Sequence, residues 1–116
     1  MSSTEFVEIR DNASLDHFLK SSPEAPVILF KHSNSCGVSA QAYREMAKLG
    51  RTVGLITVQK ARILSDEVER RFGLSHETPQ VMLVRDNEVF WNASHGRVRA
   101  DAVEKALSAA DSAELQ

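Results

Sequence analysis

Cys36, the single cysteine of this chain, is the residue with the clearest capacity for chemistry. It lies in the segment FKHSNSCGVSAQAY, where an apolar stretch gives way to a helical pattern. A thiol at the start of a helix meets unpaired backbone N–H groups and the positive end of the helix dipole, and both favour the thiolate. The polar residues directly before Cys36 are unusual for a core position. We therefore expect an exposed cysteine whose thiolate acts as a nucleophile.

Ser39 lies three residues after Cys36, where a second thiol would complete a two-cysteine site. Because residues about one turn apart share a helix face, the Ser39 hydroxyl can approach the sulfur and donate a hydrogen bond. The alternative interpretation is an ordinary serine in a first helical turn. A hydroxyl cannot form a disulfide, and one cysteine cannot pair within the chain. The chemistry is then limited to accepting one thiol group and handing it on, so any oxidised form involves another molecule.

Other residues of metal-ligating or catalytic type do not form a recognisable site in the sequence. A zinc site needs clustered ligands, which one cysteine and four scattered histidines do not supply, so no metal is expected. Ala42 occupies the position where a Cys-x₅-Arg phosphatase motif would carry arginine. Lys31 and His32 could add positive charge near Cys36, although the interpretation we favour is that both side chains are solvated. The histidines are His17, His32, His76 and His95.

Hydrophobic periodicity predicts the elements that position Cys36, in the order β-α-β-α-β-α-β-β-α. The apolar stretch 27–30 has the pattern of a strand buried on both faces, at the centre of a sheet. Two parallel crossovers, a hairpin and a covering helix describe an α/β/α three-layer sandwich with a mixed central sheet, which is the thioredoxin-like layout. The expected strands lie near 6–9, 27–30, 52–60, 81–85 and 88–92, and the expected helices near 12–22, 36–50, 62–73 and 103–110.

Individual residues are expected to begin, end or orient these elements. Asn12 or Ser14 should cap the first helix. Val38 should lie on the buried face of the second helix, which Gly50 should end. A tight turn at residues 86–87 should join the last two strands, although no glycine follows to strengthen that signal.

The size and charge of the chain limit the classes of function. With 116 residues, 42% of them apolar and 26% charged, residues 1–116 should form one thioredoxin-like domain. The net charge of −2 is spread over the chain, so we expect no nucleic-acid partner. No apolar run approaches the roughly 20 residues of a membrane span, and no secretory signal is visible, so we expect no membrane association and a cytoplasmic protein. The sequence does not determine the oligomeric state, and a monomer is the expectation that we adopt.

Thr78 and Pro79 form a candidate substrate loop. In thioredoxin-like folds the bond before such a proline is cis, and the residue before it faces the cysteine and pairs with an extended thiol substrate. X-Pro bonds are seldom cis in general, so this expectation rests on the fold, and a plain loop proline is the alternative. Trp91 is most simply a strand residue that packs on the core, with a role in the site as the alternative.

The chain resembles the monothiol bacilliredoxins, thioredoxin-fold proteins that work with the low-molecular-weight thiol bacillithiol. FKHSNSCGVSAQAY is similar to the active-site segment of that family, HETPQ to its proline loop, and VFWNASH to its hairpin signature. The family usually carries proline directly after the cysteine, whereas this chain has Gly37. Glycine should loosen the helix start and could change the stability of the thiolate.

This resemblance implies an enzyme that removes bacillithiol from proteins. Cys36 would attack a protein–bacillithiol mixed disulfide, take the bacillithiol and free the client cysteine, and a second bacillithiol would regenerate Cys36. Bacillithiol is then a co-substrate, no cofactor is tightly bound, and bacillithiolated proteins are the partners. Ser39 would lie near the leaving sulfur. The residues that would bind substrate are Gly37, Val38, Thr78 and Pro79, with His95 and Trp91 as candidates by motif match.

Two other functions remain open from the sequence. CGVS is similar to the CGFS of monothiol glutaredoxins, which hold an iron–sulfur cluster between two protomers with glutathione as the extra ligand. Those proteins carry a Gly-Gly-x-Asp segment before their last helix, whereas this chain reads SHGRVRAD, which favours the bacilliredoxin assignment. The third candidate is an interaction domain with an idle thiol, in which Cys36→Ser would change nothing.

Overall fold

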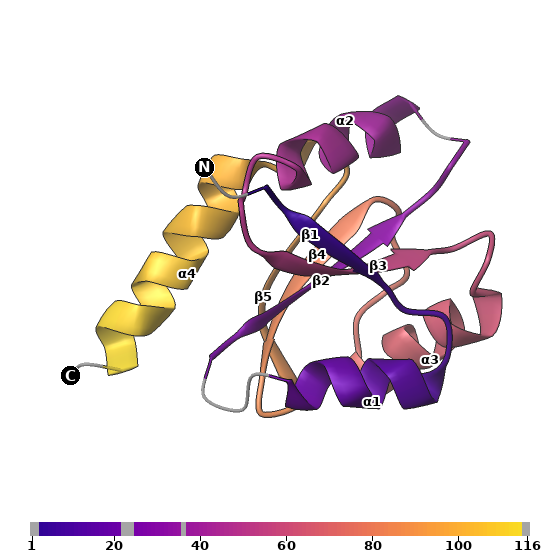
Figure 1. The fold of residues 1–116 in the computed structure, drawn as a ribbon, viewed down its shortest axis with the longest axis horizontal. Coiled ribbons are helices and arrows are strands. Elements are labelled where there is room, and N and C mark those ends of the chain that lie inside the picture. Colours follow the sequence, from indigo (N-terminus) through magenta and orange to yellow (C-terminus); the bar gives the residue numbers. More distant parts are fainter. Residues whose placement is uncertain (1–2, 22–24, 36, 115–116) are drawn as a thin grey trace.

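The computed structural model describes residues 3–21, 25–35 and 37–114, and the elements follow the predicted order with one short 3₁₀ helix added (Figure 1). No helix in these ranges combines the length and the apolar composition that crossing a membrane requires. The strands are β1 (Glu5–Glu8), β2 (Val27–His32), β3 (Thr52–Thr57), β4 (Gln80–Arg85) and β5 (Glu88–Ser94). The helices are α1 (Asn12–Lys20), α2 (Gly37–Met46), α3 (Arg62–Phe72), η1 (His95–Arg97) and α4 (Ala100–Glu114).

The five strands form one mixed sheet in the order β1-β3-β2-β4-β5. β1 and β2 run parallel to β3, whereas β4 is antiparallel to both β2 and β5. β2 is therefore the central strand, as its continuous apolar sequence predicted, and its first five residues are buried. The predicted α/β sandwich of thioredoxin type is confirmed.

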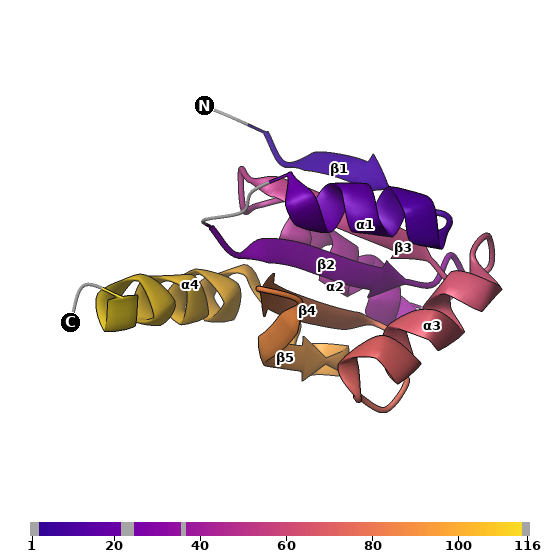
Figure 2. The ribbon, with the colours of Figure 1, turned by 90° about the horizontal axis from the view of Figure 1, so that it is seen from below.

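Helices cover both faces of the sheet, with α1 and α3 on one side and α2 on the other (Figures 1 and 2). Because side chains alternate along a strand, β2 contributes to two separate cores. Val27 and Leu29 pack in the core beneath α1 and α3, whereas Ile28 and Phe30 pack in the core beneath α2 and α4. The strand that leads toward Cys36 is thus held from both faces.

The cap of α1 differs from the prediction. Asp11, not Asn12 or Ser14, is the N-cap, and its carboxylate accepts a hydrogen bond from the Ser14 N–H at 2.8 Å. The Ser14 hydroxyl accepts in return from the Asp11 N–H at 3.3 Å, which completes a capping box. Asp, Asn and Ser are all good caps and stand close together here, so residue type alone could not separate them.

The orientation of α2 also differs from the prediction. The Val38 side chain is 46% exposed, whereas Ser39 is fully buried and continues the buried face through Ala42 and Met46. The prediction was wrong because it placed the apolar residue rather than the serine on the inner face. The helix ends at Met46, and Gly50 lies beyond it, with a φ of 65°, in the turn before β3.

Two other predicted boundaries are confirmed. Gly73 ends α3 in the left-handed region with a φ of 66°, which glycine adopts at little cost. Asp86 and Asn87 join β4 to β5, and both have positive φ, as a two-residue hairpin turn of the primed type requires. Short polar side chains tolerate this conformation, so the turn forms without glycine.

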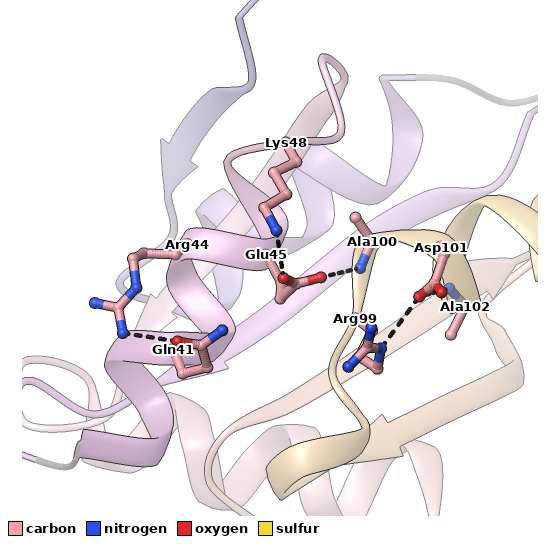
Figure 3. Close-up of polar contacts among 8 residues, drawn as sticks. All are labelled: Gln41, Arg44, Glu45, Lys48, Arg99, Ala100, Asp101 and Ala102. Carbon is pink, nitrogen blue, oxygen red and sulfur yellow. Dashed lines mark hydrogen bonds and ion pairs between the residues drawn. The ribbon is translucent and has the colours of Figure 1, made fainter.

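A carboxylate on α2 anchors the first turn of α4 (Figure 3). Glu45 is 8% exposed and accepts a hydrogen bond from the Ala100 N–H at 2.9 Å and another from the Lys48 ammonium at 2.7 Å. These bonds, that of Lys48 first, lower the pKa of Glu45 below its ordinary value. A negative charge at a helix start also interacts favourably with the helix dipole. Glu45 therefore joins two helices that are distant in the sequence.

Replacing Glu45 with glutamine should lower the free energy of unfolding by about 1–2 kcal/mol at pH 7, the usual scale for losing a helix cap. Since the folded-state pKa is depressed, the carboxylate stabilises the fold above its ordinary pKa, and this stabilisation is lost as pH falls through the folded value. In urea unfolding, Glu45→Gln should therefore be less stable than the wild type at neutral pH, and this difference in the free energy of unfolding should disappear at acid pH. Glu88→Gln, on the exposed start of β5, is the matched control. An equal difference at both pH values would contradict this account.

Candidate functional site

The segment that carries Cys36 is described on both sides of the cysteine, while Cys36 itself lies outside the described residues. β2 ends at His32, and α2 begins at Gly37, the residue after Cys36. The cysteine is thus in the chain position that the sequence predicted, between the central strand and a helix start. Its exposure and ionisation stay predictions that rest on that position.

Gln59 holds the loop before Cys36. Its side-chain carbonyl accepts from the Asn34 N–H at 3.1 Å, and its amide donates to the Ser33 hydroxyl at 2.8 Å and to the Ser35 hydroxyl at 3.2 Å. Gln59 follows β3, so one side chain from a neighbouring crossover fixes three successive loop residues. Gln59 was not predicted from the sequence, because a single glutamine after a strand belongs to no motif.

Ser39 takes part in a second network under the same loop. Its hydroxyl oxygen accepts from the Ser33 N–H at 2.9 Å and lies 2.9 Å from Nδ1 of His32. With the Ser33 N–H as donor, the hydroxyl proton is free to be donated to an unprotonated Nδ1. A hydrogen bond from Ser39 to the cysteine sulfur would compete with that contact. The role of Ser39 near the leaving sulfur stays a prediction.

His32 is partly buried, which corrects the expectation of a solvated side chain. Its ring packs against Tyr43 and Phe30, with ring centroids 5.1 and 5.7 Å away. Burial is the main cause that lowers the pKa of His32 below its ordinary value. The imidazole is therefore neutral at neutral pH and adds no positive charge to the neighbourhood of the cysteine.

Lys31 also differs from the expectation of a solvated side chain, because it is only 1% exposed. Its Nζ lies 2.8 Å from Nδ1 of His76, and burial lowers its pKa. With Lys31 as the donor to Nδ1, His76 carries its proton on Nε2, which lies 3.2 Å from the Thr78 hydroxyl oxygen. A buried cation on β2 is thereby connected to the candidate substrate loop.

The Thr78–Pro79 peptide bond is cis, as expected from the fold. Thr78 is half-buried and Pro79 is buried. The Pro79 carbonyl accepts a hydrogen bond from the His95 N–H at 2.9 Å, which joins the proline loop to the end of β5. Two of the motifs noted in the sequence, the proline loop and the hairpin signature, therefore meet in the fold.

The two candidates in the hairpin signature are in different surroundings. His95 is exposed, has a φ of 56°, and places Nε2 2.6 Å from the Glu77 carboxylate, so it lies beside the proline loop. Trp91 is partly buried and packs against the core beneath α2 and α4. The structure brings His95 into direct contact with the proline loop. Gly37 and Val38 are both exposed at the start of α2.

Comparison with known proteins identifies the family. The family model described as "Monothiol bacilliredoxin BrxC" matches residues 7–103, a span that contains the Cys36 loop, the cis-proline loop and the hairpin. The chain belongs to the monothiol bacilliredoxin family. With its thioredoxin fold, this bacilliredoxin is a thiol oxidoreductase of the thioredoxin-like class.

Solved structures agree with this assignment of the fold. A protein described as an oxidoreductase with a thioredoxin fold is 25% identical to this bacilliredoxin, with a TM-score of 0.81 over 87% of this chain and 92% of the other. Thioredoxin from Trypanosoma brucei brucei is 9% identical, with a TM-score of 0.75 over 93% and 92% of the two chains. A mutant thioredoxin from Halobacterium salinarum is 17% identical, with a TM-score of 0.70 over 94% and 93%. The two thioredoxins show likeness of fold alone.

Gly37 stands where the sequence resemblance to the bacilliredoxins led us to expect proline. A Cβ built on Gly37 would meet no atom within 4 Å among the described residues outside its chain neighbours. Packing against the described residues therefore leaves room for a Cβ at this position. The effect of Gly37 is then on the freedom of the backbone beside Cys36.

The described part of the chain holds no group of three or more His, Cys, Asp or Glu side chains placed to share a metal ion. The polar groups that the site gathers come from the end of β2, the loop before α2, Ser39 of α2, the turn after β3, the proline loop and His95. Like the role of Gln59, the contacts of Lys31, His76 and Glu77 were not predicted from the sequence. The contacts of Lys31 with His76 and of Glu77 with His95 join segments far apart in the sequence, so no local pattern encodes them.

Proposed function

We propose that the protein removes bacillithiol from protein mixed disulfides through Cys36. The match of residues 7–103 to the monothiol bacilliredoxins is the observation that carries this proposal. The fold supports it, because the cysteine follows the central strand and directly precedes α2. In that position helix N–H groups favour the thiolate, which is the nucleophile in thiol exchange.

The reaction consists of two thiol exchanges. The Cys36 thiolate attacks the bacillithiol sulfur of the client mixed disulfide; that disulfide breaks, the client sulfur leaves as a thiolate, and a Cys36–bacillithiol disulfide forms. The thiolate of a second bacillithiol then attacks the sulfur of the bound bacillithiol and releases the Cys36 thiolate. The sum converts a bacillithiolated client and one bacillithiol into a free client thiol and oxidised bacillithiol.

The remaining site residues would bind and position the mixed disulfide. Thr78 would present its backbone to the extended substrate, Pro79 would hold Thr78 in place, and Gly37 and Val38 would form the opposite side of the exposed surface. His95 is held to the Pro79 carbonyl and would extend this surface, with Trp91 behind it. Ser39 would act through the loop that it supports.

Only one chain and no resident cofactor are needed for this cycle. The sequence has a single cysteine, so the second thiol must come from solution as bacillithiol. The cysteine loop, proline loop and hairpin all belong to one chain, which suits a monomer. Since the cycle consumes a reduced thiol, it suits a reducing compartment such as the cytoplasm.

Transfer from a defined substrate tests the proposal. Reduced protein is mixed with a bacillithiolated model protein, and intact masses are recorded over time: the adduct should move to Cys36, and free bacillithiol should then remove it. A glutathionylated form of the same model protein is the matched substrate. Equal or faster transfer of glutathione would reject the preference for bacillithiol. A brown colour after anaerobic reconstitution with iron and sulfide would support the cluster-carrier alternative instead.

A further inference from the structure

A polar recess lies beside the candidate site, between the turn after β3, the first turns of α3 and the proline loop. Its volume is about 430 Å³, within the range of small-molecule sites. Polar side chains make up all of its lining except Val58. The lining residues are Val58, Gln59, Arg62, Ser65, Asp66 and His76.

Two of these residues, Gln59 and His76, connect the recess to the cysteine loop and the proline loop. Gln59 donates to the hydroxyl of Ser35, the residue bonded to Cys36, at 3.2 Å. His76 lies on the other side, with Nε2 3.2 Å from the Thr78 hydroxyl oxygen. Successive Cα atoms are about 3.8 Å apart, so a small thiol joined to Cys36 has this recess within reach.

Two of the side chains that line the recess, those of Arg62 and Asp66, are available to a ligand. Arg62 and Asp66 form neither an ion pair nor a side-chain hydrogen bond with any other described residue. Arg62 can donate two parallel hydrogen bonds to a carboxylate. Asp66 accepts hydrogen bonds and so suits hydroxyl or amide groups. Behind His76, burial lowers the pKa of Lys31, and the nearby carboxylates of Glu69, Asp66 and Glu77 act in the opposite direction.

A second recess of about 430 Å³ lies on the other side of the loop, but its charged groups are already engaged. Arg44 donates to Gln41 at 2.7 Å, and the Lys60 ammonium lies 3.8 Å from the Glu8 carboxylate. This recess includes Asn34 but no residue of the proline loop. It is therefore the less suitable site for an anionic thiol.

We infer that the recess at the start of α3 binds the polar part of the small thiol that is exchanged at Cys36. The ligand class is a thiol that carries a carboxylate together with hydroxyl or amide groups. Arg62 binds the carboxylate, and Asp66 binds the hydroxyl or amide groups. This inference rests on the proposed function and adds the reason why one small thiol is preferred over another.

The preference for a thiol with such groups is the quantity to measure. One peptide is capped by a disulfide either to bacillithiol or to cysteamine, which has no carboxylate or hydroxyl group. The ratio of kcat/KM for the two caps should exceed one in the wild type and fall about tenfold in Arg62→Ala, mainly through KM for the bacillithiol cap. Arg62→Lys should recover part of the ratio, because it keeps the charge but not the paired donors.

Arg44→Ala, in the second recess, is the matched control and should leave the ratio unchanged. An unchanged ratio in Arg62→Ala would overturn the assignment of the recess, whatever the ratio in Arg44→Ala. So would an equal loss on both caps in Arg62→Ala, and in both cases the proposed function would stand. If the wild type accepts neither cap, the proposed function fails and the inference fails with it.

Discussion

Cys36→Ser should abolish the transfer of bacillithiol, with a loss of at least about a thousandfold in the rate of client release. A serine hydroxyl is not ionised near neutral pH and cannot form a disulfide, so neither exchange can take place. The measurement is the release of free client thiol from a bacillithiolated model protein. No other cysteine in the chain can substitute.

Wild-type protein alkylated at Cys36 before the assay should show the same loss, and this provides a control that needs no substitution. The urea midpoint of Cys36→Ser should stay close to that of the wild type, which excludes unfolding as the cause. Client release at a rate near that of the wild type would mean that the thiol is idle. The interaction-domain alternative would then be preferred.

Phe30→Ala should have the largest effect on stability, a loss of about 3–5 kcal/mol in the free energy of unfolding. Phe30 is fully buried on the central strand, beneath α2, and packs in one core with Ala42 and Met46 of that helix. Truncation removes apolar contacts and leaves a cavity between the sheet and the helix that begins directly after Cys36. The loss is a large share of the roughly 5–15 kcal/mol that stabilises a typical domain.

Phe90→Ala makes the same chemical change at an exposed position of β5. Phe90 is 42% exposed, and its ring lies 5.8 Å from the Arg85 guanidinium carbon, so the expected loss is within about 1 kcal/mol. Urea unfolding of both variants gives the comparison. Similar losses at the two positions would contradict the placement of the core around β2.

The order of the helices and strands could be predicted because the apolar residues in each of them recur at the spacing of a helix or a strand. The strand at 27–30 was recognised by its continuous apolar residues, and α3 by apolar residues at helical spacing and by the glycine that ends it. Val38 shows the limit of this signal. At the start of α2 the apolar Val38 is exposed, whereas the polar Ser39 is buried and accepts a hydrogen bond from the Ser33 N–H. The apolar residue therefore does not mark the inner face of the helix there.

The candidate site was only partly predictable. The cis Thr78–Pro79 bond was expected from the fold, and the position of Cys36 between a strand and a helix was expected from the local sequence pattern. The contacts of Gln59 and Lys31 did not follow, because each joins segments that are more than 20 residues apart. Lys31 in particular contradicts the rule that lysine side chains are solvated. Only the folded arrangement shows the partner that makes its burial possible.

The ionisation of Cys36 tests the central claim most directly. The rate at which the reduced protein reacts with iodoacetamide is measured as a function of pH, and the inflection reports the pKa of its one thiol. The account predicts an inflection clearly below the value of about 8.5 for an ordinary cysteine, with Cys36 already reactive at neutral pH. An inflection at or above that value, or a thiol that reacts only after unfolding, would contradict it.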